Sequence, residues 1–226
     1  MMTLGRCIDK IKTSRCGIIP YCIRPLVTSS GYRLDFLVSK HRPSGQLGDF
    51  GGGVKKDEYA LHAGNREFIE ESKGIFQECV DINTLSSSIC FIIENDMAII
   101  FVNVGPEWYD LAPQRFLNAK LEGKTNNEVS EVVWVSESEL TELVFPRSSG
   151  VHESDSNVMW KRVKIFLQKI MRSRPGFYQF LKNKSMNDPL LWSGPLERSV
   201  SESVALRGSP NRGSGVSSVT TVPGRC

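Results

Sequence analysis

The segment GDFGGGVKKDEYALHAGNREFIEES, residues 48–72, constrains the fold more than any other part of the chain. Three consecutive glycines at residues 51–53 come before a stretch of helical composition that runs from Glu58 to about Ser72. A solvated surface helix could carry the charges of this stretch without any glycine. Glycine lets the backbone turn sharply and approach other groups closely. The segment therefore predicts a main-chain bend placed against an acidic helix.

Three carboxylates share one face of that helix. Glu67, Glu70 and Glu71 stand at positions i, i+3 and i+4, which are neighbours on a helix surface. Like charges at this spacing repel by about 0.2–0.5 kcal/mol per pair. Arg66 precedes Glu70 by four residues and can hold a carboxylate in one orientation. Carboxylate oxygens suit Mg²⁺, Mn²⁺ or Ca²⁺, so the face predicts a site for a hard cation.

Another face of the helix carries Leu61, Gly64 and Phe68. These residues are suited to packing on a sheet, and Gly64 would permit a close approach. When the helix packs on the sheet through this face, the glycines at residues 51–53 can bring a backbone carbonyl to the cation or a backbone amide to a phosphate.

The spacing of these residues resembles the Nudix box, G-x5-E-x7-R-E-U-x-E-E-x-G-U, in which U is apolar. The positions in register are Gly52, Glu58, Arg66, Glu67, Phe68, Glu70 and Glu71. The box spans residues 52–75, with one extra residue before Gly74. This insertion follows the last carboxylate, so we expect it to alter the helix exit and leave the metal face intact. Phe50 stands where many members of the family have proline.

The resemblance implies a hydrolase of nucleoside diphosphate derivatives that uses Mg²⁺ or Mn²⁺. Its implied metal ligands are the Gly51 carbonyl, Glu67, Glu70 and Glu71, and its implied catalytic residues are Arg66, Glu67, Glu70 and Glu128. Arg66 would orient a glutamate, and Glu58 would stabilise the junction between loop and helix. A general base on a different element is frequent in the family. Glu128 and Glu131 are the candidates here, and Glu128 is preferred because it lies in a loop.

The implied fold is an α/β Nudix-type α/β/α sandwich with a mixed β-sheet. Residues 16–26 and 32–41 are apolar and β-rich and predict a hairpin. Two further strand-like runs follow the acidic helix, and VSEVVWVSESEL predicts a strand that leads into a helix start. The strands do not alternate regularly with helices, which argues against a doubly wound parallel sheet.

Four parts of the chain are expected from these patterns. They are an N-terminal segment (1–14), a Nudix hydrolase domain (15–174), a basic and aromatic extension (175–193) and a tail (194–226). The tail is rich in Ser, Gly and Pro, and too poor in apolar residues to offset the entropy of ordering it, so we expect it to be disordered.

The basic segment from Lys161 to Lys184 has two interpretations. Apolar residues recur in it near helical spacing, which predicts a helix that covers the sheet while its Lys and Arg face water. Alternatively, these cations track the phosphates of RNA, which would suit a capped mRNA substrate, since cap-cleaving enzymes occur in the Nudix family.

The cysteines, the N-terminus and the histidines restrict the class of protein but do not indicate a substrate. The six cysteines contain no CxxC pair, the N-terminus lacks the apolar core of a secretory signal, and no apolar run is long enough to span a bilayer. We therefore expect a cytoplasmic protein with free thiols and no membrane partner. The three histidines are isolated, and we expect ordinary surface or core roles for them. The rival to a hydrolase of nucleotide-derived diphosphates is a catalytically silent Nudix-fold module that binds nucleotides or RNA, against which the three glutamates argue.

Overall fold

Two strands that lie far apart in the sequence, β2 (Arg15–Pro25) and β7 (Met97–Asn103), run side by side in parallel at the centre of the sheet. Their other neighbours are antiparallel, so the sheet is mixed, as predicted. The computed structural model describes residues 2–5, 12–26, 30–93, 95–123, 128–146 and 158–186. The other strands in these ranges are β1 (Met2–Gly5), β3 (Tyr32–His41), β4 (Leu47–Gly48), β5 (Phe50–Gly53), β6 (Ile89–Ile93) and β8 (Val129–Ser136). Their order is β1-β6-β7-β2-β3-β4, with β5 paired to β2 and β8 paired to β3.

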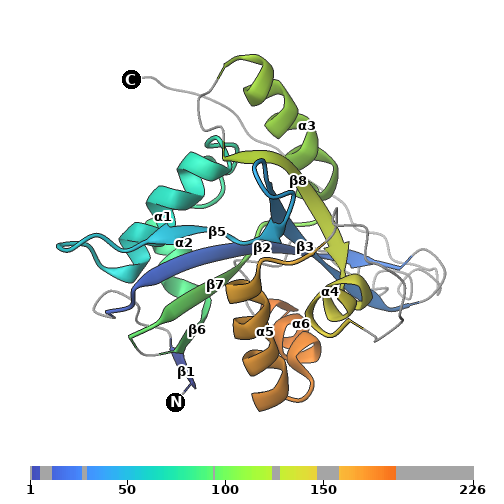
Figure 1. The fold of residues 1–226 in the computed structure, drawn as a ribbon. Coiled ribbons are helices and arrows are strands. Elements are labelled where there is room, and N and C mark those ends of the chain that lie inside the picture. The colour runs from blue at the N-terminus through green and yellow to red at the C-terminus, as the bar shows by residue number, and fades with distance from the viewer. Residues whose placement is uncertain are drawn as a thin grey trace, which may run out of the picture. The chain divides into compact units, whose positions relative to one another are not determined.

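Helices cover both faces of this sheet (Figure 1). One face is covered by α1 (Ala60–Glu71), α2 (Ile82–Ser87) and α3 (Trp108–Leu121), and the other by α4 (Glu137–Val144), α5 (Lys161–Ser173) and α6 (Phe177–Met186). Successive strand residues point to opposite faces. Ile18 accordingly lies in the core beneath α1–α3 and Ile19 in the core beneath α4–α6. The predicted α/β class with its α/β/α layering is confirmed.

The expected local elements are present. β2 and β3 form the predicted hairpin, with Tyr21 opposite Phe36. β8 leads into α4 through a capping box in which Ser136 and Glu139 satisfy each other's backbone amides. α3 is not evident from the sequence, because this helix contains Pro113 and leaves apolar side chains exposed, which hides its periodicity.

β1 and α6 both pack with the central part of the chain. β1 lies within the expected N-terminal segment, yet it pairs with β6, with Met2 opposite Ile93. α6 lies within the expected extension, yet Phe177 and Leu181 are buried in the core with α5. These two elements therefore belong to the same packed unit as residues 15–174. The expected tail, residues 194–226, lies outside the described residues.

α1 is fixed closely on the sheet, as its apolar face predicted. A Cβ atom added to Gly64 would lie 2.8 Å from Sγ of the buried Cys16 on β2, so only glycine lets the helix approach this far. The extra residue of the box is absorbed at the exit of α1, where both Lys73 and Gly74 adopt a positive φ. No helix in the described ranges is long and apolar enough to cross a bilayer.

Gly64→Ala should lower the free energy of unfolding. Alanine is favoured over glycine inside a helix by about 1 kcal/mol, but overpacking a core costs about 1–3 kcal/mol. We expect a net loss of about 1 kcal/mol, measured by urea unfolding. Adding Cys16→Ala removes the sulfur that the new methyl group meets and should restore part of the loss. An unchanged or raised stability of Gly64→Ala would show that the helix does not need this close approach.

Candidate active site

The glycine strand, residues 51–53 of β5, is a strand and not the sharp turn that the sequence predicted. It pairs antiparallel with β2, with Gly51 opposite Gly17. A Cβ atom on Gly51 would lie 2.3 Å from Cα of Gly17, so two glycines allow the two backbones to touch. The glycines serve close packing between strands, which brings β5 directly beneath the acidic end of α1.

Two of the predicted glutamates meet this strand. The amide of Gly51 donates a hydrogen bond of 2.8 Å to Oε2 of Glu71, whose residue is only 1% exposed. The carboxylate of Glu67 lies against Gly52, where a Cβ atom would approach its Cδ to 2.3 Å. Gly52 thus leaves the space that the Glu67 carboxylate fills. The structure therefore brings Glu67 and Glu71 to the glycine strand.

Arg66 clamps the entrance to α1. Its guanidinium donates to both carboxylate oxygens of Glu58, at 3.1 and 2.9 Å, and to Oε1 of Glu67 at 2.5 Å. A further bond of 3.1 Å reaches the carbonyl of Gly53. The hydrogen bonds from Arg66 hold the pKa of Glu58 below its ordinary value. One arginine thus joins the loop, the helix and the glycine strand, and it fixes the direction of the Glu67 carboxylate.

Glu70 is placed differently from Glu67 and Glu71. Its side chain is 52% exposed, and its Oε2 lies 3.9 Å from Nη1 of Arg66. In the ranges that the structure describes, no three Asp, Glu, His or Cys side chains are gathered closely enough to form a metal centre. The three glutamates therefore share a helix, but Glu70 does not join the other two at the glycine strand.

A buried ion pair beneath the glycine strand was not foreseen. Arg15 donates to both carboxylate oxygens of Asp49, at 2.6 and 2.8 Å, and to the carbonyl of Gly51 at 2.8 Å. This carbonyl, implied as a metal ligand, therefore already faces a cation. The residues of the pair are 34 apart in the sequence, and only the pairing of β2 with β5 brings them together.

A cavity of about 680 Å³ opens over these groups. Its lining includes the glycine strand, Glu67, Glu71 and Glu128, so three of the predicted acids share one space. Glu131, the other candidate base, instead lies on β8 with its carboxylate 3.7 Å from Nζ of Lys40.

The cavity also contains residues that the sequence analysis did not single out as site residues. Arg15, His41, Trp160 and Arg162 all line it. Burial lowers the pKa of His41 below its ordinary value, which favours a neutral imidazole. A register shift between Lys40 and His41 marks this end of β3. Such irregularities are common next to active sites, and this one was invisible without the strand pairing.

Burial also acts on Glu71. Desolvation first, and then the negative charge of Asp49, raise its pKa to about 8, against the opposing hydrogen bond from the Gly51 amide. A carboxylate that is buried beside a second carboxylate is costly to ionise. In the protein without metal, Glu71 is therefore mostly protonated at pH 7.

The basic segment forms two amphipathic helices. Val163, Phe166, Leu167 and Ile170 of α5 are buried in the core, which confirms the predicted helix that covers the sheet. Several of its cations have partners in the protein. Arg162 lies 2.8 Å from Asp96, Lys182 lies 2.6 Å from Glu137, and the guanidinium of Arg174 stacks over Phe180. RNA binding by this segment remains a prediction.

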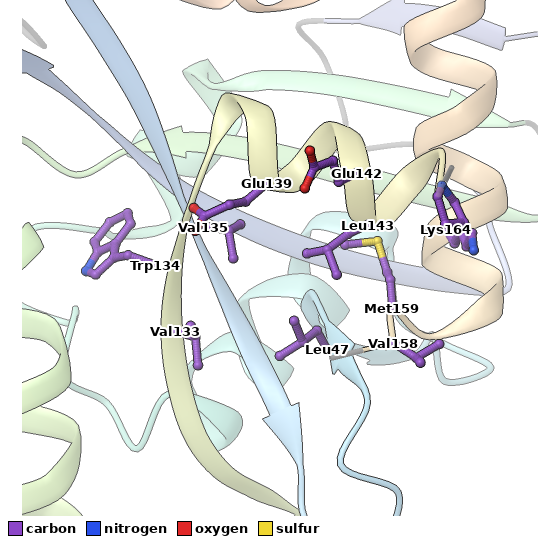
Figure 2. Close-up of a pocket in the computed structure, with 11 residues that line it drawn as sticks. Leu47, Val133, Trp134, Val135, Glu139, Glu142, Leu143, Val158, Met159 and Lys164 are labelled. Carbon is purple, nitrogen blue, oxygen red and sulfur yellow. The ribbon is translucent and has the colours of Figure 1, made fainter. Parts of the chain in front are cut away.

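A second cavity, of about 330 Å³, lies between β8, α4 and the segment before α5 (Figure 2). Its walls are mostly aliphatic, and Figure 2 shows Leu143 and Met159 facing one another while Trp134 points away. Glu139 lies at this cavity but is engaged in the capping box with Ser136. None of the predicted site residues lines this cavity, so the candidate active site is the larger one.

Comparisons with known proteins do not establish a family. No protein-family model matches the chain, and no curated protein matches it. Among solved structures, the chain is similar to a mutT/nudix family protein from Listeria innocua, with 16% identity, a TM-score of 0.41, and 76% of this chain and 99% of that one covered. It is also similar to a single-residue mutant of the Bacillus subtilis pyrophosphohydrolase BsRppH, with 12% identity, a TM-score of 0.34 and coverage of 76% and 90%. Both TM-scores are below 0.5.

The raised pKa of Glu71 predicts how stability depends on pH. The folded protein binds a proton at Glu71 that the unfolded chain releases above its ordinary pKa of 4.5. The contribution of Glu71 to the free energy of unfolding should therefore fall as pH rises from about 4.5 to about 8. The upper limit of this fall is about 1.4 kcal/mol for each unit by which the folded pKa exceeds the unfolded pKa. Glu71→Gln should flatten this slope and be more stable than wild type at pH 8.

The measurement is urea unfolding across this pH range with a chelator present, because divalent ions would obscure the effect. Glu142→Gln, on the exposed side of α4, is a matched control and should keep the wild-type slope. Parallel pH profiles for Glu71→Gln and wild type would mean that Glu71 ionises normally in the fold.

Proposed function

We propose that the protein is a Nudix pyrophosphohydrolase that cleaves the diphosphate linkage of a nucleoside diphosphate derivative with Mg²⁺ or Mn²⁺. The observation that carries this proposal is the meeting of the box residues at one place. Glu71 accepts the Gly51 amide, Glu67 fills the space left by Gly52, and Arg66 joins Glu58 to Glu67. Apart from Gly51, these contacts connect positions that are fixed in the sequence pattern, and Glu70 is the fixed acid that takes no part in them.

The residues at the site fit a hard divalent cation. Glu67 and Glu71 line the same cavity. Burial makes the ionised form of Glu71 costly, and the positive charge of a metal beside it would offset that cost. Glu67 and Glu71 would hold the ion in this cavity, and the other two implied ligands would reach it only if Glu70 left solvent and the Gly51 carbonyl left Arg15. When bound, it would supply neutralisation of the diphosphate charge and a bound water of lowered pKa.

The chain's own groups would perform the remaining steps. Arg66 keeps the Glu67 carboxylate in one orientation. Arg162 lines the cavity beside its partner Asp96 and would bind a substrate phosphate with the part of its guanidinium that stays exposed. Glu128 would accept a proton from the attacking water as its oxygen bonds to phosphorus. The P–O–P bridge then breaks, and its oxygen leaves with the departing phosphate.

Two alternatives stay open within this framework. Capped RNA is a possible substrate, with the segment from Lys161 to Lys184 following its phosphates, and Arg162 connects that segment to the cavity. A silent nucleotide-binding module would retain the cavity but cleave nothing. A panel of nucleoside diphosphate derivatives and capped RNA, assayed with and without Mg²⁺, separates these three functions.

Loss of the cavity carboxylates should abolish most of the hydrolysis. Glu67→Gln and Glu71→Gln should each lower kcat/KM by roughly 10- to 100-fold, because each variant removes a carboxylate oxygen that a metal in the cavity would bind. The assay is release of nucleoside monophosphate at saturating Mg²⁺ or Mn²⁺, with Glu142→Gln as the control that stays active. Full activity in both cavity variants would refute the mechanism, and nucleotide binding without turnover by wild type would identify a silent module.

The two candidate bases can be distinguished by a matched pair of variants. Glu128→Gln should lower kcat by roughly 10²- to 10⁴-fold with little change in KM, the usual range for loss of a general base. Glu131→Gln should leave kcat near the wild-type value, because Glu131 lies on β8 beside Lys40. Equal effects of the two substitutions would exclude Glu128 as the base.

A further inference from the structure

The ion pair of Arg15 and Asp49 is almost completely buried. Its side chains are 5% and 0% exposed, and the guanidinium contacts Asp49 through two hydrogen bonds. Trp160 covers it, with the ring centroid 4.7 Å from Cζ of Arg15. The fold makes room for the carboxylate in a specific way, since a Cβ atom on Gly17 would lie 1.5 Å from Oδ2 of Asp49.

Stability alone does not account for this pair. Two buried charges lose their hydration, and replacing such a pair with apolar side chains of similar size is often neutral or stabilising. Asp49 also brings a second negative charge near Glu71, which Arg15 offsets only in part. A buried ion pair is weak evidence for stability, and Arg15 of this pair lines the cavity, so we look for another role for it.

The contacts of Gly51 indicate that role. Nη2 of Arg15 donates to the Gly51 carbonyl at 2.8 Å, and the Gly51 amide donates to Glu71 at 2.8 Å. The peptide groups on both sides of Gly51 are therefore held by charged or acidic side chains. Glycine has the largest backbone freedom of any residue, so these two contacts remove motion that would otherwise move the amide away from Glu71.

We propose that Arg15 and Asp49 are positioning residues, which hold the glycine strand so that Gly51 keeps Glu71 in place at the cavity floor. Asp49 orients the guanidinium, the guanidinium fixes the Gly51 carbonyl, and the Gly51 amide fixes the carboxyl group. The catalytic part of this inference rests on the proposed hydrolase function. The placement of Gly51 and Glu71 by Arg15 and Asp49 depends only on contacts within the chain and not on that function.

The test replaces the pair with apolar side chains, as Arg15→Met with Asp49→Leu. We expect a melting temperature within a few degrees of wild type, kcat lowered about 10-fold or more, and KM for the nucleotide within about 2-fold. The matched control is Arg24→Met with Asp35→Leu. That pair also joins a buried aspartate to an arginine, at 2.7 Å, but it lies on β2 and β3 and does not line the cavity. It should leave kcat unchanged.

A second measurement does not depend on activity or on metal. Hydrogen exchange of the Gly51 amide on β5 in metal-free protein should be faster by about 10-fold or more in the double variant, while exchange of the amides in the part of β2 that pairs with β3 stays unchanged. Arg15→Lys supplies a milder change if the double variant does not fold. Lysine has a single ammonium group and cannot reproduce the bidentate contact together with the carbonyl bond, so it should show the same faster exchange.

An unchanged Gly51 exchange rate in a folded variant would overturn the inference. So would a kcat that falls only in proportion to lost stability, or an equal fall in the Arg24 and Asp35 control. If wild type hydrolyses no diphosphate at all, the proposed function fails, and the exchange rate of the Gly51 amide still decides whether Arg15 positions it.

Discussion

The close approach of β5 to β2 is the constraint on which the site depends. Gly17 and Gly51 face each other across the two strands with no room for a side chain on Gly51. This contact fixes the position of the glycine strand in the sheet. It therefore also fixes where the carboxyl groups of Glu67 and Glu71 must lie to contact that strand. A helix placed one methyl group further out would not bring Glu71 within hydrogen-bond distance of the Gly51 amide.

β2 is the element that joins the site to the fold. It pairs with β3, β5 and β7, it receives α1 through Gly64 above Cys16, and it supplies Arg15 to the cavity floor. Its side chains alternate between the two cores, so the strand is held on both faces. The site is thus built on a central strand, where packing on both sides limits motion, while the turns and the start of α5 contribute the outer lining.

The sequence predicted the local parts of this arrangement and not the long-range ones. Glu67, Glu71 and Arg66 follow from spacing along one helix, and Gly64 follows from the helix face it shares with Leu61. The contact of Arg15 with Asp49 depends on which strands become neighbours, and no spacing within β2 or β5 reveals it. For the same reason the glycine run by itself predicts a turn, because its strand partner Gly17 lies more than thirty residues earlier in the chain.

The charges at the cavity floor lead to one further step. Asp49 and Glu71 are two buried carboxyl groups, and Arg15 supplies one buried guanidinium that is bound to Asp49. Burial strips an ionised Glu71 of its hydration, and the charge of Asp49 adds more to this cost than the Arg15 guanidinium removes, so the pKa of Glu71 is raised to about 8. A divalent cation and a proton would therefore compete for Glu71. Metal binding at this floor should release a proton below pH 8 and should strengthen as pH rises towards that value.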